Sequence, residues 1–175
     1  TEVERLVERV KEIVEEHRKK LEELARRSEE LVERHEKKLR DLLRESRELV
    51  ERAKKENSKD RTVLKELRDL VRELNKRSKE LSEETRRRVA KTNDDSRKTS
   101  KRTREEIERL LRELERDDAR DEIKERLKEL LREAEEVSRR VNKRNEDLLR
   151  RLEKVSREVN ERNEDLLEEL DRTVN

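Results

Sequence analysis

Two histidines, His17 and His35, are the side chains of this chain best suited to acid–base chemistry near neutral pH. Apolar residues recur around them at helical spacing, so both imidazoles are expected to face the interior of a helical bundle. Burial lowers the pKa of an imidazole because the charged form loses its hydration. The two histidines are therefore either satisfied polar residues of the core or a pH switch, in which acid protonates the rings and weakens the fold. The sequence leaves both interpretations open.

A metal site or a catalytic centre at the histidines is not indicated. The two residues lie about 27 Å apart along one helix and cannot share an ion. Val14 and Val32 stand three residues before them, where a di-iron bundle carries glutamate. A Ser–His pair also needs an orienting carboxylate and an oxyanion hole, and we expect no Asp or Glu to point inward at the level of the histidines. We therefore expect no enzyme activity, no metal and no cofactor.

An 18-residue repeat organises the helices that would position the histidines. Residues 137–154 and 155–172 are identical at twelve of eighteen positions, and each of the six differences exchanges one charged residue for another. Eighteen residues make about five turns, so the pattern returns to the same helix face without angular drift. Heptad repeats drift one way and eleven-residue repeats the other. The repeat therefore predicts straight helices without a supercoil.

The predicted fold is all-α, an antiparallel up-down-up three-helix bundle with long helices. The helices are expected over about residues 2–56, 61–115 and 119–173, within a single domain that spans residues 1–175. On each helix the apolar residues occupy an arc of roughly 120°. An arc of this width suits a helix that contacts two neighbours.

Polar residues interrupt the apolar pattern between the predicted helices. Asn57 is a suitable helix end, and Ser58 or Asp60 can cap the second helix by accepting hydrogen bonds from its first N–H groups. Asp117 and Asp118 end the second helix, and one of them is the expected cap of the third. Such short connections force each helix to return antiparallel to the previous one.

The composition is typical of long helices and excludes several other classes of protein. Of the 175 residues, 58% are charged and 27% are apolar, and Gly, Pro, Cys, Met, Phe, Tyr and Trp are absent. Turn-rich folds need Gly and Pro, and disulfides need Cys. No stretch is apolar enough for a membrane span, and no secretory signal is recognisable, so a soluble protein is expected. The net charge of +2 implies no particular partner.

Polar side chains at core positions line up between the predicted helices. Antiparallel pairing places residue i of the first helix level with about residue 117 − i of the second. By the same reasoning, residue j of the second helix is level with about residue 236 − j of the third. His17 then lies level with Ser100 and beside Ser138. The hydroxyls are therefore expected within reach of the imidazole.

The second histidine follows the same arithmetic, since His35 lies level with Ser82 and beside Ser156. Asparagines also coincide in cross-sectional layers, with Leu and Val layers between them. An unpaired buried amide or hydroxyl costs roughly 1–3 kcal/mol, so these residues are expected to satisfy one another. The predicted buried network comprises His17, His35, Ser28, Ser46, Asn75, Ser78, Ser82, Thr85, Asn93, Ser96, Ser100, Thr103, Ser138, Asn142, Asn145, Ser156, Asn160 and Asn163.

The chain resembles de novo designed helical bundles with buried hydrogen-bond networks. The features that carry the resemblance are idealised helices, a small number of amino-acid types and stacked layers of Asn, Ser, Thr and His. The resemblance covers the whole chain. It implies a designed structural scaffold without natural activity, obtained by recombinant expression, in which the network specifies register. Within that group, histidine networks imply opening at acid pH.

Residues 85–104 form a strongly basic stretch, with nine Lys or Arg residues against Asp94 and Asp95. Such a stretch could bind phosphate groups. No aromatic residue is available to stack on bases, so nucleic acid is a less favoured partner than solvent.

Self-association is the remaining alternative, because the polar layers of the second helix could face a second copy of the chain. The chain would then be a homo-oligomeric building block. The narrow apolar arcs favour a monomer that requires no partner.

Overall fold

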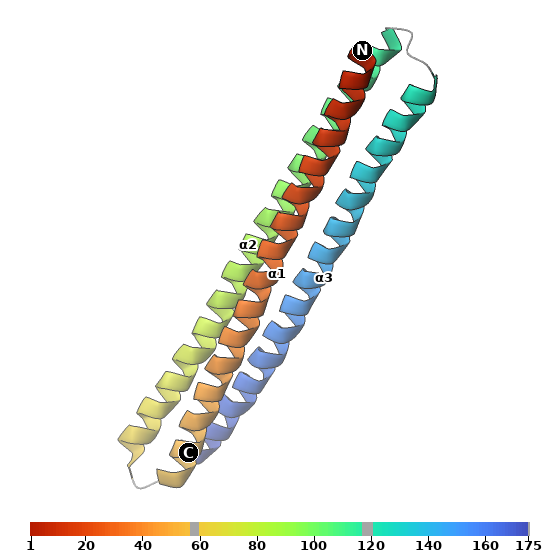
Figure 1. Ribbon diagram of the computed structural model, residues 1–175. Helices are drawn as coiled ribbons and strands as arrows, with labels where there is room; N and C mark the ends of the chain where they lie inside the picture. The colour runs from red at the N-terminus through yellow and green to blue at the C-terminus, as the bar shows by residue number, and fades with distance from the viewer. Residues whose placement is uncertain (57–59, 117–120, 175) are drawn as a thin grey trace. The chain divides into compact units, whose positions relative to one another are not determined.

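The fold is a three-helix bundle, which confirms the predicted class (Figure 1). A computed structural model describes residues 1–56, 60–116 and 121–174. The helices are α1 (Glu2–Glu56), α2 (Arg61–Arg116) and α3 (Asp121–Val174). The described ranges contain no strand. None of the described helices carries an apolar stretch that could cross a membrane.

Side-chain caps begin the first two helices. The Glu4 N–H donates to Thr1 Oγ1 at 3.3 Å, and the Thr62 N–H donates to Asp60 Oδ1 at 3.0 Å. Asp60 is thus the cap of α2, one of the two residues predicted for this role. Outside the described residues lie the other predicted ends and caps, Asn57, Ser58, Asp117 and Asp118, and the predicted start of the third helix at residue 119.

The contacts divide the chain into two compact units, and each takes one stretch of every helix. Unit 1 comprises Thr1–Glu29 and Val89–Asp147, and unit 2 comprises Glu30–Arg88 and Leu148–Asn175. A single domain over residues 1–175 and straight helices both stay predictions. Each unit has its own apolar core.

In unit 1, residues of all three helices meet in one cluster. Val10 of α1, Ile107 of α2 and Leu127 of α3 belong to it and are all fully buried. A residue early in α1 thus shares a core with a residue late in α2, as antiparallel helices require. A second cluster joins Leu21 and its neighbours on α1 to α3. Each fully buried aliphatic side chain contributes about 1.5–3 kcal/mol relative to an exposed one.

Unit 2 repeats this arrangement with the opposite ends of the helices. Val50 of α1 shares a core with Leu64 of α2 and Leu170 of α3. A second cluster joins Leu39 of α1 to Val159 of α3. The ends of α1 and α3 thus meet the beginning of α2, so α1 and α3 run parallel.

Charged side chains link α1 to α3 at one constant sequence separation. Three ion pairs share a spacing of 115 residues, namely Glu29–Arg144 in unit 1 and Glu36–Arg151 and Lys54–Glu169 in unit 2. A one-residue shift of either helix would separate all three pairs. The constant spacing therefore defines one register between these helices within each unit.

Candidate functional site

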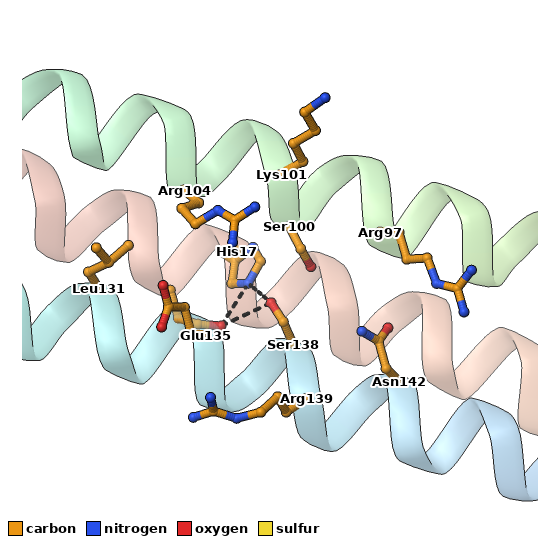
Figure 2. Close-up of a pocket in the computed structure, with 11 residues that line it drawn as sticks. His17, Arg97, Ser100, Lys101, Arg104, Leu131, Glu135, Ser138, Arg139 and Asn142 are labelled. Atoms are coloured by element: carbon orange, nitrogen blue, oxygen red, sulfur yellow. Dashed lines mark hydrogen bonds between the residues drawn. The ribbon is translucent and has the colours of Figure 1, made fainter.

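His17 lies on α1 inside unit 1 and is only 2% exposed. Its Nε2 atom contacts two groups of α3, Ser138 Oγ at 3.0 Å and the Ala134 carbonyl oxygen at 3.2 Å (Figure 2). The Ser138 hydroxyl donates to the same carbonyl at 3.0 Å. A carbonyl can only accept, so Nε2 carries the proton and donates. The neutral ring then has a bare Nδ1 atom, which is buried and has no hydrogen-bond partner among the described residues.

The environment of His17 disfavours the charged imidazole. Burial lowers its pKa below the ordinary value, and the positive charge of Lys20 lowers it further. The hydrogen bond to the Ala134 carbonyl raises the pKa but does not offset the burial. His17 is therefore held neutral to lower pH than a histidine in water.

His35 occupies the equivalent position one repeat later on α1, inside unit 2. It is 5% exposed, and its Nε2–H donates to the Leu81 carbonyl oxygen of α2 at 2.6 Å. Burial is the largest cause that lowers its pKa, and the backbone hydrogen bond and the nearby Glu84 carboxylate oppose the effect. The predicted level is correct, since Leu81 adjoins Ser82. The partner of the imidazole, however, is a backbone carbonyl of α2.

One difference between the repeats accompanies the different partners. Ala134, whose carbonyl His17 contacts, is replaced eighteen residues later by Leu152, which is only 1% exposed. We attribute the direction of His35 to this bulk, because a leucine side chain fills the space beside the α3 backbone. Ser156, the equivalent of Ser138, keeps a buried Oγ atom without a partner among the described residues.

Five of the ten hydroxyls in the predicted network bond to their own helix. Each donates to the carbonyl four residues earlier, over 2.9–3.1 Å, in Ser46, Ser82, Thr85, Ser100 and Ser138. Such local bonds compete with contacts to another helix. Within the described part of this set, the His17–Ser138 contact is the one hydrogen bond that joins side chains of two different helices.

The amides of the set are enclosed but largely without partners. Asn145 in unit 1 and Asn163 in unit 2 are 0% exposed, and neither side chain has a hydrogen-bond partner among the described residues. The same holds for the Oδ1 atoms of Asn75, Asn93 and Asn160 and the Oγ atoms of Ser28, Ser78 and Ser96. These groups therefore cost stability as placed.

All residues of the predicted set lie at least half buried. Eleven are buried, namely His17, Ser28, His35, Ser46, Asn75, Ser78, Thr85, Ser96, Thr103, Asn145 and Asn163. Seven are half-buried, namely Ser82, Asn93, Ser100, Ser138, Asn142, Ser156 and Asn160. The set is thus enclosed by the helices, whereas its mutual hydrogen bonding is limited.

Glu36 corrects the expectation that no carboxylate faces inward near the histidines. It is 5% exposed and pairs with Arg151 of α3 through two contacts, Oε1 to Nε at 2.6 Å and Oε2 to Nη2 at 3.1 Å. A two-pronged guanidinium makes the burial of a carboxylate tolerable. The sequence pattern did not predict this burial because Glu36 lies at the edge of the apolar arc. The spacing of 115 residues between Glu36 and an arginine, which Glu29 shares, could have indicated the ion pair.

No cluster for a metal ion is present in the described ranges, where three or more His, Cys, Asp or Glu side chains never gather suitably. The described polar interior therefore offers hydrogen bonding, with one histidine–serine contact in unit 1 and a histidine–carbonyl contact in unit 2.

No protein-family model and no curated protein matches the chain. Among solved structures, it is similar to a "Computationally designed three helix bundle", with a TM-score of 0.62 and 18% sequence identity, over 99% of this chain and 87% of that chain. This likeness shows that the two chains share a three-helix fold.

Proposed function

We propose that the chain is a designed structural scaffold without natural biochemical activity, whose polar core residues and ion pairs specify the register of its helices. The observation that carries the proposal is the constant 115-residue spacing of the α1–α3 ion pairs in both units. The similar designed bundle, the 18-residue repeat and the absence of seven amino-acid types support a designed origin.

Buried amides contribute to the same role at a cost in stability. An unpaired buried amide costs about 1–3 kcal/mol, so Asn145 and Asn163 weaken the fold as placed. A single buried Asn in a coiled coil is retained because it disfavours other registers and oligomers. We assign that role to these two side chains.

His17 has no catalytic role in such a scaffold. The Ser138 hydroxyl already donates its proton to the Ala134 carbonyl, and the imidazole donates toward the hydroxyl oxygen. The imidazole is therefore not arranged to remove a proton from this serine, which a nucleophilic serine would require.

The test replaces the two amides with apolar side chains of similar size, as Asn145→Leu and Asn163→Leu together. We expect the variant to resist denaturant better, because two unpaired amides are gone. We also expect the variant to populate more than one helix register or oligomeric state. Additional methyl NMR signals or a mass above 21.5 kDa in solution would show this. The parent should give one set of signals at the monomer mass.

The register role would be wrong if the double variant kept one set of signals and the monomer mass. The matched comparison is Val141→Leu with Val159→Leu, which changes buried apolar residues of both units and removes no amide. That variant should keep the parent's single set of signals.

A further inference from the structure

A groove lies between α2 and α3 in unit 1, with His17 of α1 at its floor (Figure 2). Its volume is about 380 Å³. Ser100, Ser138 and Asn142 contribute polar side chains to its lining. The groove is open to solvent at the top and reaches one buried titratable ring at the bottom.

Cationic side chains dominate the rim of this groove. Arg97, Lys101, Arg104 and Arg139 line it together with one carboxylate, Glu135, which gives a net charge of +3. Arg97, Lys101 and Arg104 form no ion pair within the described ranges. In Figure 2 the Arg104 side chain extends toward His17, whereas the Arg97 side chain extends away from His17 and Lys101 points away from the groove. The Arg104 guanidinium thus lies near the floor of the groove and Arg97 lines it farther along, and neither has an anionic partner among the described residues.

The fourth cation of the rim, Arg139, already has an anionic partner. Arg139 pairs with Glu136 on its own helix at 2.8 Å. The Ser100 hydroxyl donates to the Ser96 carbonyl. The lining groups whose donors are not engaged by a described residue are therefore Arg97, Lys101, Arg104 and the Asn142 amide, and of these Lys101 points away from the groove.

The buried Nδ1 atom of His17 is a second, independent observation. It has no partner among the described residues, and the ring is 98% buried, since 2% is exposed. When His17 is charged, this atom carries a proton and becomes a donor. The lining of one groove then contains two arginines and a charged histidine, a set of donors that suits the oxygens of an anion.

Unit 2 contains the matching groove with the opposite charge. It lies between the same helices, measures about 400 Å³ and is lined by Ser82, Ser156 and Asn160. Its charged residues are two arginines and four glutamates, a net charge of −2, and His35 does not line it. Size and hydroxyl lining are thus shared, while a net positive charge and a histidine occur in the unit 1 groove alone of the two.

We propose that the groove over His17 is a binding site for a small tetrahedral oxyanion, such as sulfate or inorganic phosphate, held by Arg97, Arg104 and the imidazole. The Asn142 amide adds a neutral donor at the same edge. The bound anion replaces the missing anionic partner of the two guanidinium groups.

Binding is coupled to protonation of His17. The charges around the ring are Lys20 on α1, Arg97, Lys101 and Arg104 on α2, and Glu135 and Arg139 on α3. This predominantly positive surround opposes a further positive charge on the imidazole, and an anion removes that opposition. The anion therefore binds more tightly as the pH falls, and it raises the pKa of His17.

The test uses sulfate, whose charge is constant between pH 5 and 8, and follows the two imidazoles by NMR. His17 and His35 are the only histidines, so each gives one resolved ring signal. With sulfate, compared with chloride at equal ionic strength, the His17 signal should shift saturably and its pKa should rise. His35 should respond equally to both salts.

Variants separate a built site from general attraction. Arg97→Gln with Arg104→Gln removes two charge-assisted hydrogen bonds and should weaken sulfate binding about tenfold or more. Arg86→Gln with Arg157→Gln removes the same number of charges from the unit 2 groove and should leave binding unchanged. Equal His17 shifts in sulfate and chloride, equal weakening by both double variants, or unchanged binding after Arg97→Gln with Arg104→Gln would each overturn the proposal.

Discussion

His17 and His35 stand eighteen residues apart at equivalent positions of α1, yet their imidazoles donate to different helices. His17 donates to Ser138 and Ala134 of α3, whereas His35 donates to the Leu81 carbonyl of α2. Histidines at equivalent positions of two successive repeats thus have different environments. Each unit therefore provides a control for the other, since corresponding substitutions change one contact at a time.

Ser138→Ala and Ser156→Ala form the most direct matched pair. Ser138 accepts a hydrogen bond from His17, while the Ser156 hydroxyl is buried without a partner among the described residues. Ser138→Ala should lower the free energy of unfolding by about 1 kcal/mol. Ser156→Ala should leave it unchanged or raise it, because an unsatisfied hydroxyl is removed. Urea denaturation measures both, and equal losses would contradict the assigned contacts.

The partner of His17 was predictable because helix pairing depends on the loop position and the rise per residue alone. The sum of about 117 places His17 level with Ser100, and the sum of about 236 then places Ser100 level with about residue 136, beside Ser138. The positions of the two connections set these sums. The partner of His35 was not predictable in this way. An imidazole can rotate toward either neighbouring helix, and we attribute the choice to the bulk of Ala134 or Leu152 on α3. The sequence period predicts which face of the helix a residue occupies, but it does not predict the rotamer of the side chain.

Acid should weaken the fold through the two histidines. Burial lowers the folded-state pKa of both His17 and His35 below the unfolded value of about 6.5. Below pH 6.5 the unfolded chain therefore binds more protons than the folded chain. Their contribution to stability is complete above pH 6.5 and declines as the pH falls toward the lower folded-state values. Thermal melts between pH 7.5 and 5.0 should show a falling midpoint.

The comparison for this titration is His17→Gln with His35→Gln, which keeps polar side chains that do not titrate. Its melting midpoint should depend less on pH in the same window. We expect His17→Gln alone to remove more of the dependence than His35→Gln, because protonation of His17 places a donor on the buried, unpartnered Nδ1 atom. A parent midpoint that stays constant from pH 7.5 to 5.0 would exclude any titration of buried histidines.

Glu36 illustrates what the hydrophobic pattern omits. A carboxylate at the edge of an apolar arc is read as solvated, and most such residues are exposed. Glu36 is buried because Arg151 on a parallel helix meets both of its oxygens. The pairing depends on the axial offset between α1 and α3. A short stretch of sequence carries no information about that offset. The apolar core was therefore easier to predict than the ion pairs that surround it.

Glu36→Gln should destabilise unit 2 more than Glu29→Gln destabilises unit 1. The Glu36 side chain is 7% exposed and that of Arg151 45%, so the substitution removes a charged contact that is buried on the Glu36 side. We expect about 1–2 kcal/mol, below the cost for a fully buried pair because water reaches the arginine. Glu29 is 34% exposed, and its loss should cost less than about 1 kcal/mol. Adding Arg151→Gln to Glu36→Gln should recover part of the loss; full additivity would mean the pair is not coupled.

Ala134→Leu tests why the histidines differ, because it gives unit 1 the residue that occupies the same repeat position in unit 2. Ala134 is 3% exposed, so the added atoms must displace its neighbours, at a cost of about 1–3 kcal/mol. The imidazole of His17 should then lose its contacts with α3, and its ring signals should change in NMR spectra. Ser138→Ala should consequently become neutral in the Ala134→Leu background. If Ser138→Ala still costs about 1 kcal/mol there, the bulk at position 134 does not decide the partner, and the direction of His35 has another cause within unit 2.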